Sequence, residues 1–148
     1  MRSAQDSSLY LAWLVAIVAT IGSLYFSEVR QFVPCALCWF QRVFMYPLAL
    51  MLGLASLRQD KSVVPYALIL SVVGGGFSVY HLLEQNISNF RPPAMCNAGV
   101  PCSAKYINWL GFISIPVLAL TAFVLITALL LVARRRIAGG LQAEASPS

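Results

Sequence analysis

Four long apolar blocks alternate with short polar segments along the chain. They run from about Leu9 to Phe26, Trp39 to Leu57, Val63 to Leu83 and Trp109 to Val132. Each block is close to the roughly 20 residues that a helix needs to cross the hydrocarbon core of a bilayer. Helix is the expected form, because a lone strand would leave its backbone groups unpaired in lipid. The pattern predicts an all-α membrane protein, a bundle of four transmembrane helices.

Composition supports a membrane protein. The chain has 148 residues, of which 59% are hydrophobic and only 10% are charged, whereas soluble domains carry about 25% charged residues. The length allows one domain, which we expect to be a four-helix membrane domain over residues 1–136, followed by a disordered cytoplasmic tail over 137–148. The first block is expected to remain as a helix, because it lacks the flanking residues of a signal peptide.

The basic residues predict the orientation. Four helices place both termini on one side, together with the turn between the second and third blocks. That side carries Arg2, Arg58, Lys61, Arg134, Arg135 and Arg136, and the other side carries Arg30, Arg42, Arg91 and Lys105. The positive-inside rule then puts both termini in the cytoplasm of a multi-pass protein of the inner or plasma membrane. Because the net charge of +5 is divided between two sides, no nucleic-acid partner is expected.

All four cysteines fall on the side opposite the termini. They are Cys35, Cys38, Cys96 and Cys102. Disulfides persist in oxidising compartments outside the cytoplasm. The cysteine positions therefore agree with the orientation that the charges predict, with the cysteine loops on the extracytoplasmic side.

The segment Pro34 to Arg42 carries the strongest chemical signal. Pro34 is expected to begin the second helix, which places Cys35 and Cys38 within or next to its first turn. The free N–H groups and the positive end of the helix dipole favour a reactive thiolate there. A disulfide across two intervening residues opens easily to thiolate attack. Arg42 lies one turn deeper on the face of Cys38, where it can contact a bound acceptor or extend to lipid headgroups.

A second cysteine pair lies in the longest non-helical segment. Cys96 and Cys102 are surrounded by prolines and glycines that indicate a bent loop, and they could form a structural clip or a redox-active pair. A zinc site is not expected, since Cys35 and Cys38 are tied to a helix end and cannot converge freely with the loop. Covalent haem is disfavoured because Trp39 stands where that motif needs histidine.

Two disulfides, one exposed and one at the lipid boundary, suit an electron relay. An external dithiol protein would reduce the Cys96–Cys102 disulfide, and the released thiol would reduce the Cys35–Cys38 disulfide. The final acceptor must dissolve in lipid, and a quinone meets that requirement. His81 is the only histidine, at about the depth of Arg42. It could hydrogen-bond a quinone carbonyl, or simply cap the helix at the headgroups.

The residues Cys35-Ala36-Leu37-Cys38-Trp39-Phe40-Gln41-Arg42 resemble the C-x-L-C-x-x-Q-R motif of the DsbB family of thiol:quinone oxidoreductases. Tyr46-Pro47 and the close second cysteine pair are similar to the compact BdbC branch of that family. The resemblance spans about residues 9–133. It implies a disulfide-generating enzyme, a protein-dithiol:quinone oxidoreductase. Its acceptor would be ubiquinone or menaquinone, and its partner a thioredoxin-fold thiol oxidase similar to DsbA or BdbD.

The resemblance also implies a role for each site residue. Cys38 would face the quinone and Arg42 would contact it, with His81 matching a third-helix histidine near the quinone. Cys96 would form the mixed disulfide with the partner, and Cys102 would then attack Cys35. The second pair is much farther apart in the longer DsbB branch, which leaves the order of attack within Cys96 and Cys102 open.

Two other functions are compatible with four helices and a CxxC pair. A vitamin K epoxide reductase-like enzyme is also quinone-linked, but its CxxC lies late in the chain, whereas this one is early. A non-catalytic tetraspan protein could use the same cysteines as structural disulfides. Static disulfides would stay oxidised when a reduced partner is added without quinone.

Overall fold

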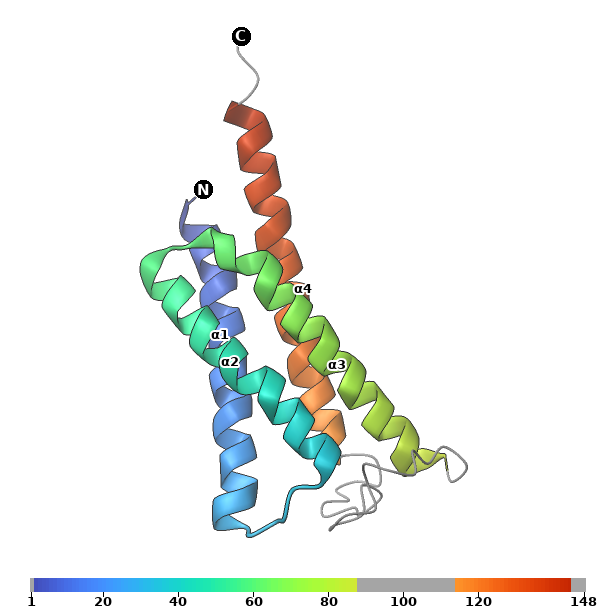
Figure 1. Cartoon of the computed structure of the whole chain (residues 1–148). Coiled ribbons are helices and arrows are strands. Elements are labelled where there is room, and N and C mark those ends of the chain that lie inside the picture. The colour runs from blue at the N-terminus through green and yellow to red at the C-terminus, as the bar shows by residue number, and fades with distance from the viewer. Residues whose placement is uncertain (1, 88–113, 145–148) are drawn as a thin grey trace.

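The computed structural model describes residues 2–87 and 114–144, which form an all-helical bundle (Figure 1). The long helices are α1 (Arg2–Leu24), α2 (Ala36–Arg58), α3 (Val64–Asn86) and α4 (Ile115–Glu144). All four include a stretch long and apolar enough to cross a membrane. The predicted fold class, a four-helix membrane bundle, is confirmed. Each helix extends beyond its apolar block at one end or both, because a helix can continue into the polar region at the membrane surface. α1 ends at Leu24, before Phe26, and α4 begins at Ile115, after Trp109.

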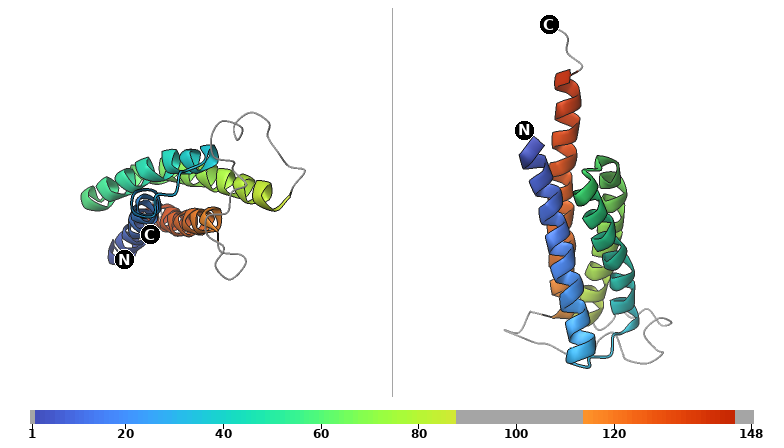
Figure 2. Two further views of the ribbon diagram at one scale, coloured as in Figure 1. Left: turned by 90° about the horizontal axis from the view of Figure 1, so that it is seen from below. Right: turned by 90° about the vertical axis from the view of Figure 1, so that its left-hand side faces the viewer.

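The helices pack as a ring in which each one contacts two neighbours. α1 packs against α2 and α4, and α3 packs against the same two helices. Figure 2 shows α1 beside α4 on one side of the bundle and α2 beside α3 on the other. All four helices contribute to the buried core, with Ala16, Leu48, Ala67 and Ile126 fully inaccessible. The ring leaves the N-terminal end of α2 next to α3, which positions the site.

Glycines allow two of these contacts to be close. A Cβ added at Gly74 would lie 2.5 Å from the ring of Phe123 on α4, and one at Gly53 would lie 2.7 Å from the Trp13 indole nitrogen on α1. Small residues let neighbouring helices approach closely, and α3 contains a run of three glycines. The structure assigns that function to Gly74, since a Cβ at Gly76 would meet nothing within 4 Å.

Different helix ends and connections lie at the two ends of the bundle. The start of α1, the end of α4 and the turn between α2 and α3 lie at one end (Figure 1). α1 continues as a π-helical segment, Tyr25–Val29, toward the other end. The connection to α2 and the N-terminus of α2 lie there (Figures 1 and 2). The CxxC pair is therefore at the end of the bundle opposite the start of α1, as the topology requires.

The predicted tail is one point of difference. The sequence predicted disorder over 137–148, but α4 remains helical through Glu144. This part of the chain contains the good helix formers Ala138, Leu141, Gln142 and Ala143, whose propensity outweighs the cost of Gly139 and Gly140. The last four residues, 145–148, lie outside the described part of the chain.

Candidate active site

The cysteine pair lies where α2 begins. Cys35 is the N-cap residue, with φ −72° and ψ 171°, and its sulfur accepts a hydrogen bond from the backbone N–H of Cys38 at 3.4 Å. Pro34 was expected to begin this helix, but it lies directly before the N-cap residue, and α2 begins at Ala36. The two sulfurs are 2.8 Å apart. The prediction that both cysteines lie in or next to the first turn of this helix is confirmed.

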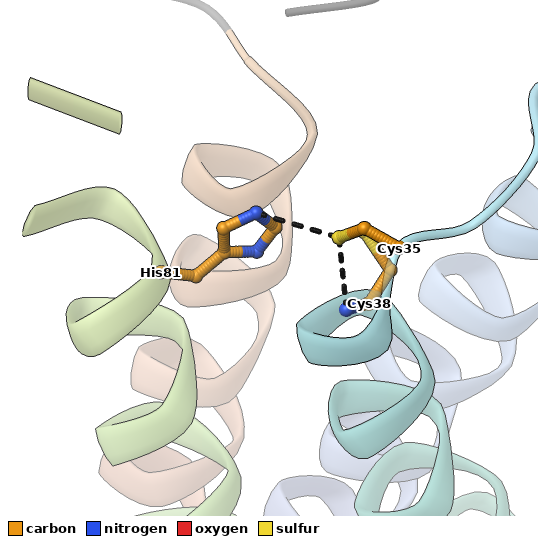
Figure 3. Close-up of side chains that lie close together, drawn as sticks. All are labelled: Cys35, Cys38 and His81. Carbon is orange, nitrogen blue, oxygen red and sulfur yellow. Dashed lines mark hydrogen bonds between the residues drawn. The ribbon is translucent and has the colours of Figure 1, made fainter. Parts of the chain in front are cut away.

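His81 reaches the pair from α3. Its Nε2 lies 3.7 Å from Cys35 Sγ, and both side chains are buried. Figure 3 shows the imidazole directed at that sulfur across the gap between α3 and the start of α2. The sequence predicted His81 near the quinone, and the structure adds a contact with Cys35 that the sequence did not indicate.

The surroundings of Cys35 favour its thiolate. The side-chain hydrogen bond with Cys38 lowers the pKa of Cys35 most, and the hydrogen bond with His81 lowers it further. Burial opposes these effects, but the pKa of Cys35 still falls well below its usual range. Because the thiolate is both the better nucleophile and the better leaving group, Cys35 is suited to disulfide exchange.

Gln41 is a site residue to which sequence reasoning gave no role. Its side chain is buried, and its Nε2 lies 3.2 Å from His81 Nδ1. An amide nitrogen can only donate, so Nδ1 accepts this hydrogen bond. A neutral imidazole then carries its one hydrogen on Nε2, the nitrogen that faces Cys35. The signal that could have indicated Gln41 was its place in the C-x-L-C-x-x-Q-R motif, as an amide within an apolar helix.

The same cluster has side chains that also bind transition metals. The ligand atoms of Cys35, Cys38 and His81 lie within 4.8 Å of one another. A metal held between them would need a lone pair on His81 Nε2, because that nitrogen faces the sulfurs. With Gln41 Nε2 as the donor to Nδ1, a neutral imidazole carries its hydrogen on Nε2 and has no lone pair there. The arrangement suits a hydrogen-bond donor to sulfur better than it suits a metal ligand.

Arg42 is directed toward α1. Its Nη2 donates a hydrogen bond to the backbone carbonyl of Ser23 at 3.1 Å. Its guanidinium also lies over the ring of Trp39, 5.6 Å from the centroid. Ser23 stands just before the π-helical segment Tyr25–Val29, and such segments are frequent near functional sites. The structure thus holds Arg42 against α1 and Trp39, while His81 meets the cysteines from α3.

Cys96 and Cys102 lie outside the described residues. Their predicted roles, as the pair that meets an external dithiol protein, therefore stay predictions. Of the six residues singled out from the sequence for redox or quinone chemistry, the structure describes Cys35, Cys38, Arg42 and His81.

Two thiols lie at the N-terminus of α2, at one end of a membrane-spanning four-helix bundle, and a buried histidine faces one of them. This arrangement is typical of a membrane thiol oxidoreductase. Comparison with known proteins makes the assignment specific. The family model for "Disulfide bond formation protein DsbB" matches residues 5–133. The chain belongs to the DsbB family, which confirms the resemblance seen in the C-x-L-C-x-x-Q-R motif.

Individual relatives agree with the family match. The chain is 53% identical over 118 residues to disulfide bond formation protein C of Bacillus subtilis, an alignment that covers 80% of this chain and 86% of that protein. It is 46% identical over 133 residues to a probable disulfide formation protein of Coxiella burnetii, covering 89% of this chain and 90% of the relative. No solved structure matches. These relatives place the chain among proteins of disulfide bond formation.

Proposed function

We propose that this protein oxidises a thioredoxin-fold dithiol protein similar to DsbA or BdbD and passes the two electrons to a quinone. The observation that carries the proposal is the geometry at Cys35: a sulfur 2.8 Å from Cys38 Sγ and 3.7 Å from His81 Nε2, at a helix N-terminus. Such a sulfur can leave and return as a thiolate, which a cycling disulfide requires.

The relay begins at the loop pair. A thiolate of the partner attacks Cys96, the Cys96–Cys102 bond breaks, and Cys102 leaves as a thiolate. Cys102 then attacks Cys35, which breaks the Cys35–Cys38 bond and leaves the electron pair on Cys38. The partner's second thiolate next releases Cys96, so that the partner departs with its own disulfide.

The cycle closes in two further steps. Cys96 attacks Cys102 and re-forms the loop disulfide, and Cys35 leaves as a thiolate. The Cys35–Cys38 disulfide then re-forms with loss of two electrons, which pass with two protons to the quinone. Overall, one dithiol becomes a disulfide and one quinone becomes a hydroquinone.

The residues in the first turns of α2 could bind a quinone. Cys38 is only half-buried, and Trp39 beside it is 56% exposed, so this face of the helix is open to a lipid-soluble ring. The Arg42 guanidinium has five N–H donors, and its contact with Ser23 holds it one turn from Cys38. We propose that its remaining donors bind a quinone carbonyl. His81, which contacts Cys35, is a second candidate to hydrogen-bond a quinone carbonyl.

The proposed orientation puts the CxxC end outside the cytoplasm and both termini inside. It is supported by the basic residues Arg58, Lys61 and Arg134–Arg136, which belong to the α2–α3 turn and the C-terminal part of α4. Cytoplasmic positive charge of this kind orients membrane helices. Labelling intact cells with a membrane-impermeant thiol reagent tests it, because only externally placed cysteines would react after reduction.

Quinone reduction by the purified full-length protein tests the proposed function. A reduced thioredoxin-fold dithiol protein is supplied as electron donor, and the loss of quinone absorbance is followed. We expect turnover in the unsubstituted protein and none in Cys38→Ser, because the last sulfur before the quinone is then missing. Quinone reduction that persists in Cys38→Ser would contradict the relay. A protein with purely structural disulfides would show no turnover in either form.

A further inference from the structure

Three buried side chains from two helices form a directed chain of hydrogen bonds. Gln41 Nε2 lies 3.2 Å from His81 Nδ1, and His81 Nε2 lies 3.7 Å from Cys35 Sγ. Gln41 is 5% exposed, His81 1% and Cys35 5%. Away from water, each donor depends on the acceptor that the protein provides, so the direction of one hydrogen bond fixes the direction of the next.

Without Gln41, the imidazole could carry its hydrogen on either nitrogen. Only the tautomer with hydrogen on Nε2 can donate to Cys35, whereas the other would turn a lone pair toward a sulfur that is negatively charged after it leaves. The amide nitrogen of Gln41 selects the first tautomer, because it needs an acceptor at Nδ1. The two residues stand on different helices, so the contact also fixes the rotation of the imidazole between α2 and α3.

We propose that Gln41 is a positioning residue that holds His81 in the tautomer that donates a hydrogen bond from Nε2 to the Cys35 thiolate. This inference rests on the proposed function for its place in the cycle. It applies when Cys96 attacks the Cys35–Cys102 disulfide: the electron pair of the broken bond stays on Cys35 Sγ, and the N–H of His81 stabilises it there. The same hydrogen bond holds the sulfur 2.8 Å from Cys38 for re-formation of the disulfide.

Nuclear magnetic resonance on the unsubstituted protein tests the tautomer directly. His81 is the only histidine in the chain, so a full-length protein without a histidine tag, labelled with ¹⁵N in its imidazole, gives signals from this residue alone. We expect a protonated Nε2 and an unprotonated Nδ1 at neutral pH. A spectrum with the hydrogen on Nδ1 would overturn the proposal, and this result does not depend on any variant folding.

Alkylation of Cys35 measures the consequence. The full-length protein is reduced and treated with a neutral alkylating reagent across a pH series, and modified Cys35 is quantified by mass spectrometry of its peptide. Gln41→Leu keeps the volume of the side chain but removes the donor. We expect it to move the midpoint of the pH profile of Cys35 alkylation upward by about one unit, which slows alkylation about tenfold at pH values below that midpoint. Among the described residues, the titratable groups that act on Cys35 are Cys38 on its own helix and His81 on α3.

A double-mutant cycle separates positioning from general loss of structure. If Gln41 acts through His81, Gln41→Leu should cause no further slowing in a His81→Ala background. Ser78→Ala is the matched control, because Ser78 is a buried polar residue of α3 whose hydroxyl binds the Gly74 carbonyl. It should leave the alkylation of Cys35 unchanged. Additive effects of Gln41→Leu and His81→Ala, or an equal effect of Ser78→Ala, would overturn the proposal.

These readouts are independent of quinone turnover. If the unsubstituted protein fails to reduce quinone while the tautomer and the alkylation cycle are as expected, the proposed function is wrong and the hydrogen-bond chain stands. If quinone turnover is normal but Gln41→Leu has the alkylation profile of the unsubstituted protein, the role of Gln41 is wrong and the proposed function stands.

Discussion

His81 Nε2 lies 3.7 Å from Cys35 Sγ, although 46 residues separate the two along the chain. The contact exists because α2 and α3 pack side by side with the first turn of α2 next to the last turns of α3. It gives the buried thiolate of Cys35 a hydrogen-bond donor in surroundings where water is scarce. A charge in such a place is costly unless it is paired or hydrogen-bonded.

Replacement of His81 tests this contact through quinone reduction. We expect His81→Ala to lower turnover by about tenfold or more, because Cys35 loses the donor that stabilises it as a leaving group. His81→Gln should keep part of the activity, since its amide nitrogen can still donate toward the sulfur. Equal loss in both variants, measured as the rate at saturating quinone, would argue that the imidazole acts by some other means.

Arg42 should act on quinone binding. We expect Arg42→Ala to raise the quinone concentration needed for half-maximal rate about tenfold or more, as for the loss of a hydrogen bond from a charged group, worth about 1.5–3 kcal/mol. The quinone concentration that Arg42→Lys needs for half-maximal rate should lie between those of the unsubstituted protein and Arg42→Ala, because lysine keeps the charge but not the planar guanidinium group. Arg58→Ala, at the opposite end of α2, is the control and should behave as the unsubstituted protein. An unchanged quinone dependence in Arg42→Ala would remove Arg42 from the quinone site.

The order of attack in the loop can be read from a trapped complex. We expect Cys102→Ser to accumulate a covalent complex with the dithiol partner through Cys96, because the released sulfur that would carry the reaction forward is missing. Non-reducing electrophoresis followed by mass spectrometry of the linked peptides identifies the bond. A complex that forms only with Cys96→Ser would reverse the proposed order of the two cysteines.

The run of three glycines in α3 provides a paired test of packing. Gly74→Ala would place a Cβ 2.5 Å from the Phe123 ring and 3.1 Å from Phe44 Cβ. We expect it to lower the stability of the bundle by about 1–3 kcal/mol, the usual cost of overpacking a core. Gly76→Ala meets nothing within 4 Å and should be neutral or slightly stabilising. Thermal unfolding in detergent compares the two, and equal melting temperatures would contradict the close α3–α4 contact.

The sequence alone determined the helices and the position of the CxxC pair. Apolar length decides whether a segment can span a bilayer, and this is a local property that can be counted along the chain. Pro34 and the N-cap position of Cys35 are also local, so the first turn of α2 was predictable. The sequence predicted a disordered tail over residues 137–148, whereas α4 is helical through Glu144, where good helix formers stand beside the two glycines.

Only the tertiary structure decided which side chains meet. The binding of Gln41 to His81, the approach of His81 to Cys35 and the contact of Arg42 with Ser23 all join different helices. Such contacts depend on which face each helix turns inward. In a soluble helix a polar face would reveal that rotation, but a lipid-exposed helix is apolar on nearly every face, and its sequence pattern does not show it. The sequence determined which reactive residues stand in the first turns of α2, and helix packing determined which residues of α1 and α3 contact them.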